Sequence, residues 1–155
     1  MSYLSAIHEI HRNSIEPLLG AARGCSVSEV DELERTLGFT LPAAYREYLL
    51  WMGKDYDGIF RGSDCFIDNV IENNSWLPEL LTENGIKFDL PEDYLAFFMH
   101  QGYAAAWFTV PAEPDPQCWY FAEGDTEMPV QKGSFSSVIL TQIQSLLPVI
   151  RGNLV

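Results

Sequence analysis

The amino-acid sequence predicts an α+β fold, with N-terminal helices and a C-terminal helix packed against one antiparallel meander sheet of about four to six strands. Three observations support this prediction. Apolar residues recur at helical spacing through residues 3–52, strand-forming runs separated by turn residues occupy 94–130, and helical spacing returns after residue 134. We expect the helices on one face of the sheet. The length of 155 residues suits a single domain covering 1–155.

The first helix is predicted over residues 3–19. Its apolar face repeats at steps of three and four residues and comprises Leu4, Ile7, His11, Ile15 and Leu18. The second helix begins at Ser26, because Glu29 follows at the spacing of a capping box. It ends at Gly38, since glycine tolerates the left-handed conformation that often terminates a helix.

A third helix is predicted over residues 42–53, with proline in its first turn and glycine at its end. Residues 54–64 are rich in aspartate and glycine, which predicts a loop, with a short strand at Ile59-Phe60. A further helix is expected within residues 66–83. Pro78 leaves the start of that helix open, because proline disrupts a helix interior.

The strands of the sheet are expected at 94–99, 103–110, 117–122 and near Val130. Gln101-Gly102 is a candidate for a tight turn between the first two. Aromatic and aliphatic residues lie on both faces of the first strand. The last helix is predicted at about 136–147, with Ser134 or Ser136 as its cap.

The charge of the chain is strongly negative and unevenly distributed. The 22 acidic and 9 basic residues give −13, and residues 62–131 hold 13 acids against one base, Lys87. Such a field disfavours nucleic acids and anionic membranes, whose phosphates require clustered lysine and arginine. It favours a basic protein partner, because complementary charge speeds encounter. The alternative is that the charge serves solubility alone.

Other features indicate a cytoplasmic protein without a cofactor. The N-terminus lacks the pattern of a signal peptide, and no apolar run is long enough for a membrane helix. Three cysteines, Cys25, Cys65 and Cys118, are far apart and odd in number, which is typical of reduced thiols. The histidines lack metal-ligand spacing and no nucleotide-binding or nucleophile motif occurs, so we expect no metal site and no enzyme. Abundant carboxylates keep a small hydrolase open as a third possibility.

The segment from Ser26 to Leu49 resembles the opening of the SUKH superfamily, which includes bacterial immunity proteins and Smi/Knr-type fungal cell-wall regulators. The positions that carry this resemblance are Glu34, Gly38, Leu41, Pro42, Tyr45 and Leu49. Residues 94–103 and the segment from Ser134 are also similar, so the resemblance covers about 1–147. The loop after Met52-Gly53 departs from the family pattern, which often has Asn-Gly there.

The resemblance implies an α+β fold and, for bacterial members, neutralisation of a toxin, often a nuclease, by direct binding. The alternative is a regulatory or scaffold module of the Smi/Knr kind. We expect a monomer or weak homodimer. Acidic loops and two tryptophans set among polar residues are the candidates for partner contact, because half-exposed tryptophan is typical of hot spots. They are Asp55, Asp57, Asp64, Asp68, Trp76, Glu113, Asp115, Trp119, Glu123, Asp125 and Glu127.

Overall fold

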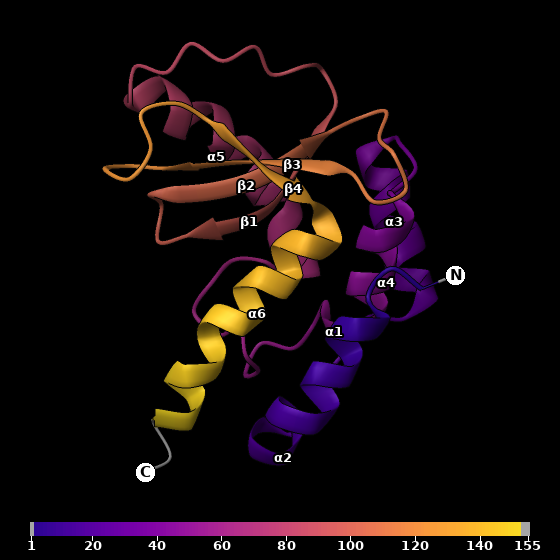
Figure 1. Cartoon of the computed structure of the whole chain (residues 1–155). Coiled ribbons are helices and arrows are strands. Elements are labelled where there is room, and N and C mark those ends of the chain that lie inside the picture. The colour runs from indigo at the N-terminus through magenta and orange to yellow at the C-terminus, as the bar shows by residue number, and fades with distance from the viewer. Residues whose placement is uncertain (1, 153–155) are drawn as a thin grey trace.

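The structure, a computed structural model, describes residues 2–152. Helices precede and follow a four-stranded antiparallel meander (Figure 1), which confirms the predicted α+β class. The helices are α1 (Ser5–Ile10), η1 (His11–Ile15), α2 (Glu16–Leu19), α3 (Val27–Leu37), α4 (Ala43–Met52), η2 (Ile67–Asn69), α5 (Val70–Glu83) and α6 (Phe135–Gly152). The strands are β1 (Tyr94–His100), β2 (Ala104–Thr109), β3 (Gln117–Ala122) and β4 (Val130–Ser134), in the spatial order β1-β2-β3-β4.

The first predicted helix is divided into three segments, because a π-helical turn, η1, separates α1 from α2. Its predicted apolar face is buried except at one position. Leu18 is 41% exposed, so it does not share the buried face predicted for it. Each hydrogen bond in a π-helical turn spans one more residue than in an α-helix. The turn therefore rotates the face that α2 directs toward the core.

Local signals in the sequence set the bounds of α3. The Ser26 hydroxyl accepts a hydrogen bond from the Glu29 backbone N–H, and the Glu29 carboxylate accepts one from the Ser26 backbone, which forms the predicted capping box. Gly38 ends the helix at φ 81°. Glu34 then accepts a hydrogen bond from the Leu41 N–H at 3.0 Å and lies 3.3 Å from Arg46, which fixes the turn into α4.

Residues 54–63 form successive turns in place of the predicted short strand. Backbone hydrogen bonds link Asp55 to Gly58, Gly58 to Arg61 and Phe60 to Ser63, each three residues apart. Ile59 and Phe60 are buried, but they reach the core from a turn. The strand prediction was wrong because apolar burial is shared by strands and by compact turns.

The turn between β1 and β2 occurs at Gln101-Gly102 as predicted. Both residues have positive φ, 48° and 76°, and the Tyr103 N–H closes the turn by donating to the His100 carbonyl at 3.1 Å. This turn and the β3–β4 turn lie at one end of the sheet, since the Glu123 N–H donates to the Tyr103 carbonyl at 2.8 Å. The β2–β3 loop lies at the opposite end (Figure 1).

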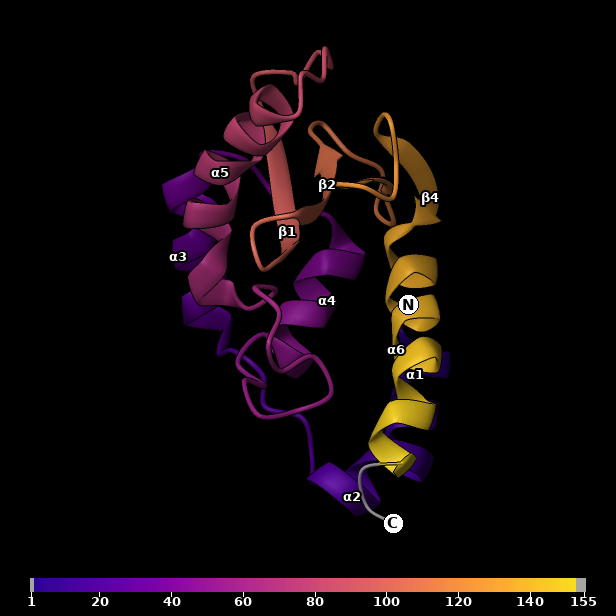
Figure 2. The ribbon, with the colours of Figure 1, turned by 90° about the vertical axis from the view of Figure 1, so that its left-hand side faces the viewer.

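Apolar side chains cover both faces of the sheet, so the expectation of helices on one face was wrong. On one face of the sheet, the side chains of Leu95, Phe97 and Phe108 pack with α4 and with Phe135 of α6. The other packs against α5 and residues 86–90 through Ala96, Met99, Trp107 and Phe121. Figure 2 shows α5 and α6 on opposite sides of the molecule. Strands with apolar residues at successive positions need cover on both sides.

The C-terminal helix α6 is longer than predicted and packs beside α1. It begins where Asp115, from the β2–β3 loop, accepts a hydrogen bond from the Ser136 N–H at 2.9 Å. Core residues from both ends of the chain share this layer, namely Leu4, Ile7, Ile15, Ile139 and Ile143. Within residues 2–152, no helix has the length and apolar character needed to cross a membrane.

Candidate protein-interaction site

Helix α5 presents an acidic outer face that also carries exposed apolar side chains. Its inner residues Leu77, Leu80 and Leu81 pack on the sheet. Its outer face exposes Ile71 (50%) and Trp76 (48%), together with the carboxylates of Glu72, Glu79 and Glu83. No lysine or arginine occurs from residue 62 to residue 86. The face therefore combines aromatic contact area with uncompensated negative charge.

Two asparagines attach α5 to the edge of β1. Asn74 Oδ1 accepts from the Ala96 N–H at 2.7 Å, and Asn74 Nδ2 donates to the Tyr94 carbonyl at 3.3 Å. Asn73 Nδ2 donates to the carbonyls of Asp64 (2.8 Å) and Ala96 (3.3 Å). These bonds satisfy backbone groups that an edge strand would otherwise expose.

Pro78 lies inside α5 and leaves one helical carbonyl without its usual donor, because proline has no N–H to offer to residue i−4. That carbonyl belongs to Asn74. It accepts a hydrogen bond from the Tyr94 hydroxyl at 2.7 Å instead. A side chain of the sheet thus replaces the missing helical hydrogen bond, and the helix continues through Pro78. The sequence alone had left the start of this helix undecided because of that proline.

Asp64 borders α5 on a fixed backbone. It forms an isolated antiparallel bridge with Met99, in which the Asp64 N–H donates to the Met99 carbonyl at 2.8 Å and the Met99 N–H donates back at 3.1 Å. A groove of about 430 Å³ lies between this bridge, α5 and the β1–β2 turn. It is lined by Asp64, Asn69, Glu72, Asn73, Trp76, Met99, Gln101 and Gly102.

The other flank of α5 differs because its charges are paired. A second groove of about 370 Å³ separates α5 from α3 and includes Glu29, Glu32, Asp68 and Ile71. Lys54 pairs with Glu29, and Arg35 pairs with Glu32 at 2.5 Å. The Lys54 ammonium and the Ser26 cap lower the pKa of Glu29 to about 2. Uncompensated charge is therefore concentrated at the groove that Asp64 borders.

The structure brings some predicted contact residues together around this groove. Asp64 and Trp76 line it, whereas Asp68 lines the second groove and accepts a hydrogen bond from Tyr56. The β3–β4 turn, with the exposed Glu123, Asp125 and Glu127, is at the same end of the sheet as the Gln101-Gly102 turn. Asp125, however, lines the groove beside α6 that also contains Arg61 and Lys132.

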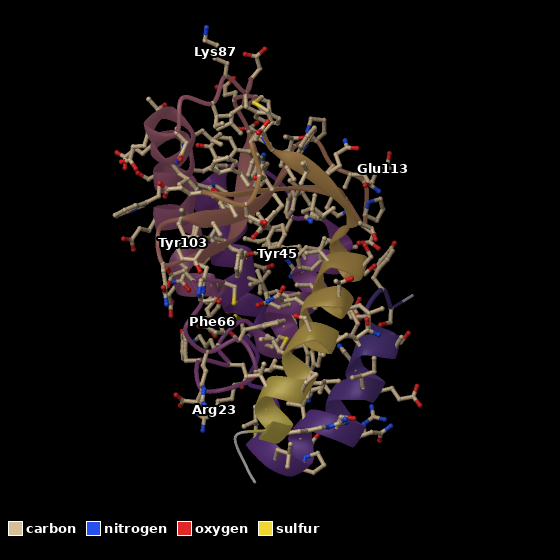
Figure 3. The ribbon with its side chains drawn as sticks, turned by 60° about the vertical axis from the view of Figure 1, so that its left-hand side comes forward. Arg23, Tyr45, Phe66, Lys87, Tyr103 and Glu113 are labelled. Atoms are coloured by element: carbon tan, nitrogen blue, oxygen red, sulfur yellow. The ribbon has the colours of Figure 1, made fainter. Side chains whose placement is uncertain are left out.

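Other predicted contact residues lie elsewhere or serve the fold. Glu113 is exposed in the β2–β3 loop, and Figure 3 shows it on the opposite side from Tyr103. Asp115 caps α6, and Trp119 packs against Phe88 with ring centroids 4.9 Å apart.

In the loop after α4, Asp57 is exposed but Asp55 is buried. The Asp55 carboxylate accepts a hydrogen bond from the Arg23 N–H at 3.3 Å, and burial raises its pKa. Asp55 does not fit the contact role predicted for it, because its side chain is inside the protein.

Glu72, Asn73 and Gln101 line the groove but are absent from the predicted contact residues. Glu72 had a signal, because it precedes Trp76 by four residues in a predicted helix, and that spacing places both on one face. No local sequence signal marked Asn73 or Gln101, because their position depends on a contact between segments about 30 residues apart.

The described residues offer no cluster of three or more histidine, cysteine or carboxylate groups for a metal ion. His8 and His11 pack against Trp51, with ring centroids at 4.0 and 5.3 Å, and burial lowers the pKa of both. The thiols of Cys25, Cys65 and Cys118 are buried and unpaired. A groove of about 540 Å³ beside α6 contains Arg61 and Lys132, so its charge suits a basic partner poorly.

Comparison with known families gives one match. The family described as SMI1/KNR4 (SUKH-1) matches residues 24–140, from the segment before α3 into α6. None of the curated proteins matches the chain. The positions that carried the sequence resemblance, such as Glu34, Gly38 and Tyr45, hold the α3–α4 turn and the core. These positions therefore specify the fold, and the family match as a whole also includes α5.

Proposed function

Because the chain belongs to the SMI1/KNR4 family (SUKH-1), we propose that it is an immunity-type protein that binds and neutralises a cognate toxin. The toxin is a basic domain, such as a nuclease of a polymorphic toxin or contact-dependent inhibition system. The chain acts by occupying the surface of the toxin, without catalysis or a cofactor of its own. It does so in the cytoplasm, where its three unpaired thiols stay reduced, and as a monomer or weak homodimer.

The observation that carries this proposal is the outer face of α5. A half-exposed tryptophan supplies contact energy, and surrounding carboxylates steer a basic partner. Nuclease surfaces that hold phosphates are basic, so an acidic face can occupy them in place of nucleic acid. The attachment of α5 to β1 keeps this face rigid, which limits the entropy lost on binding.

The experiment uses the toxin domain encoded beside the gene. The purified toxin is titrated into the chain by calorimetry at several salt concentrations, and cells producing the toxin are scored for survival with and without the chain. We expect Trp76→Ala to weaken binding about thirtyfold, as for a hot-spot residue. The pair Glu72→Lys and Glu79→Lys should weaken it roughly tenfold and flatten its salt dependence.

The matched control reverses two exposed charges away from α5, Glu9→Lys and Glu113→Lys. This control should retain the affinity of the unaltered chain. Equal losses in both pairs would show that the net charge acts without a defined face. Absence of binding to any neighbouring toxin would refute the immunity role and leave the scaffold alternative.

A further inference from the structure

We propose that the groove between Asp64, Trp76 and the β1–β2 turn is a receptor for one arginine side chain. The guanidinium would lie on the Trp76 ring, between the carboxylates of Asp64 and Glu72. The identity of the protein that carries this arginine rests on the proposed function. The chemistry of the groove does not, because it follows from the side chains that line it.

The charge of the lining selects a cation. The groove contains two carboxylates, Asp64 and Glu72, and its other polar side chains are amides. No basic residue lines it, and the nearest bases along the chain are Arg61 and Lys87. Figure 3 shows Lys87 at the far tip of the loop that follows α5. An anionic ligand would therefore meet only repulsion here.

A buried amide supplies an acceptor that the protein leaves open. Asn73 is 4% exposed, and its Nδ2 is occupied by the carbonyls of Asp64 and Ala96. Its Oδ1 accepts no hydrogen bond from the residues that the structure describes, although the side chain lines the groove. The Oδ1 atom is open to solvent in the groove, so a donor from a ligand can replace water there. This observation is independent of the carboxylates.

The shape of the lining favours arginine over lysine. A guanidinium is planar, stacks on an indole ring and offers five N–H donors, whereas an ammonium is a compact, strongly hydrated charge. The exposed Trp76 ring gives the plane, and Asp64, Glu72 and Asn73 give acceptors around it. The Asp64–Met99 bridge fixes the backbone of Asp64, and the bond from Asn73 Nδ2 to the Asp64 carbonyl at 2.8 Å orients the Asn73 amide.

The test needs no partner protein. Nα-acetyl-arginine amide is titrated into the full chain, and the indole N–H resonance of Trp76 is followed by two-dimensional NMR, with Trp76→Phe used for assignment. The matched control ligand is Nα-acetyl-citrulline amide, which has nearly the same shape without the charge. We expect a saturable shift with the arginine derivative and none with the citrulline derivative.

Three variants complete the design. Asp64→Asn and Glu72→Gln should each weaken the binding of the arginine derivative about three- to fivefold, as expected for partly exposed ion pairs. Glu113→Gln removes one exposed charge from the β2–β3 loop, outside the groove, and should leave the affinity unchanged. Equal shifts with both ligands, no shift with either, or equal losses in all three variants would overturn the proposal.

The two proposals fail separately. If the arginine derivative binds but no neighbouring toxin does, the groove is an arginine receptor for another partner. If a toxin binds through α5 and its affinity is unaffected by Asp64→Asn and Glu72→Gln, the arginine assignment is wrong while the immunity role stands.

Discussion

The hydrogen bond between the Tyr94 hydroxyl and the Asn74 carbonyl gives the sharpest test of how α5 is held. Tyr94→Phe removes the donor that replaces the missing N–H of Pro78. A carbonyl left without a donor costs about 1–3 kcal/mol when buried, and the half-buried position of Tyr94 places the loss near 1.5 kcal/mol. Burial also raises the pKa of Tyr94, so its hydroxyl stays a donor throughout the neutral range.

The same loss should depend on Pro78. In a Pro78→Ala background the alanine N–H can pair with the Asn74 carbonyl, so Tyr94→Phe should then cost only about 0.5 kcal/mol. The double-mutant cycle should give a coupling of about 1 kcal/mol. With a urea m-value of about 2 kcal/mol/M, Tyr94→Phe should lower the unfolding midpoint by about 0.75 M in the natural background and by about 0.25 M in Pro78→Ala.

The assay is equilibrium urea unfolding at 25 °C, followed by tryptophan fluorescence and by far-ultraviolet circular dichroism. Coincident transitions show that a two-state treatment applies. If Tyr94→Phe lowered the free energy of unfolding equally in both backgrounds, the carbonyl of Asn74 would not be the group that links Tyr94 to Pro78.

Three further predictions concern the cap of α6, one carboxylate and the thiols. Asp115→Ala should lower the free energy of unfolding by about 1 kcal/mol in urea, because it removes a helix cap, whereas Glu113→Ala should have no effect. In an NMR titration Glu29 should titrate near pH 2, and Lys54→Gln should raise that midpoint. Because the pKa of Glu29 in the folded protein lies below the ordinary 4.5, any stabilisation by the Lys54–Glu29 pair is present above pH 4.5. It is lost as the pH falls toward 2. A midpoint near 4.5 in the unaltered chain would contradict the Lys54–Glu29 pairing. Burial raises the pKa of Cys25 to about 11 and that of Cys65 and Cys118 to about 12. A thiol reagent at pH 8 should therefore label no cysteine in the native chain and all three cysteines in urea. Labelling of the native chain would contradict the burial of these thiols.

Features encoded by neighbouring residues were predictable from the sequence. The Ser26–Glu29 capping box, the Gly38 terminus of α3 and the Gln101-Gly102 turn depend on contacts within four residues, and the structure has all three. The expectations that were wrong depend on contacts between residues distant in the sequence. Ile59-Phe60 reaches the core from a turn, and the second face of the sheet needed α5 as cover, which its local pattern did not reveal.

The candidate site shows the same division. Trp76 was predictable as an exposed aromatic, and Glu72 follows from helical spacing. The groove itself exists because Asp64 pairs with Met99 and Asn73 turns toward β1, two contacts between distant segments. Aspartates in similar sequence surroundings therefore have different structural roles. Asp64 borders the groove, Asp55 is buried and Asp115 caps a helix.

The packing of α1 beside α6 also bears on how the chain can be shortened. The family match spans residues 24–140, yet Leu4, Ile7, Ile15 and Ile143 are core residues outside it. A fragment trimmed to the matched residues would bare the apolar surface that these four side chains now cover. Such surfaces promote self-association, so the trimmed fragment should precipitate or oligomerise where the full chain stays dispersed.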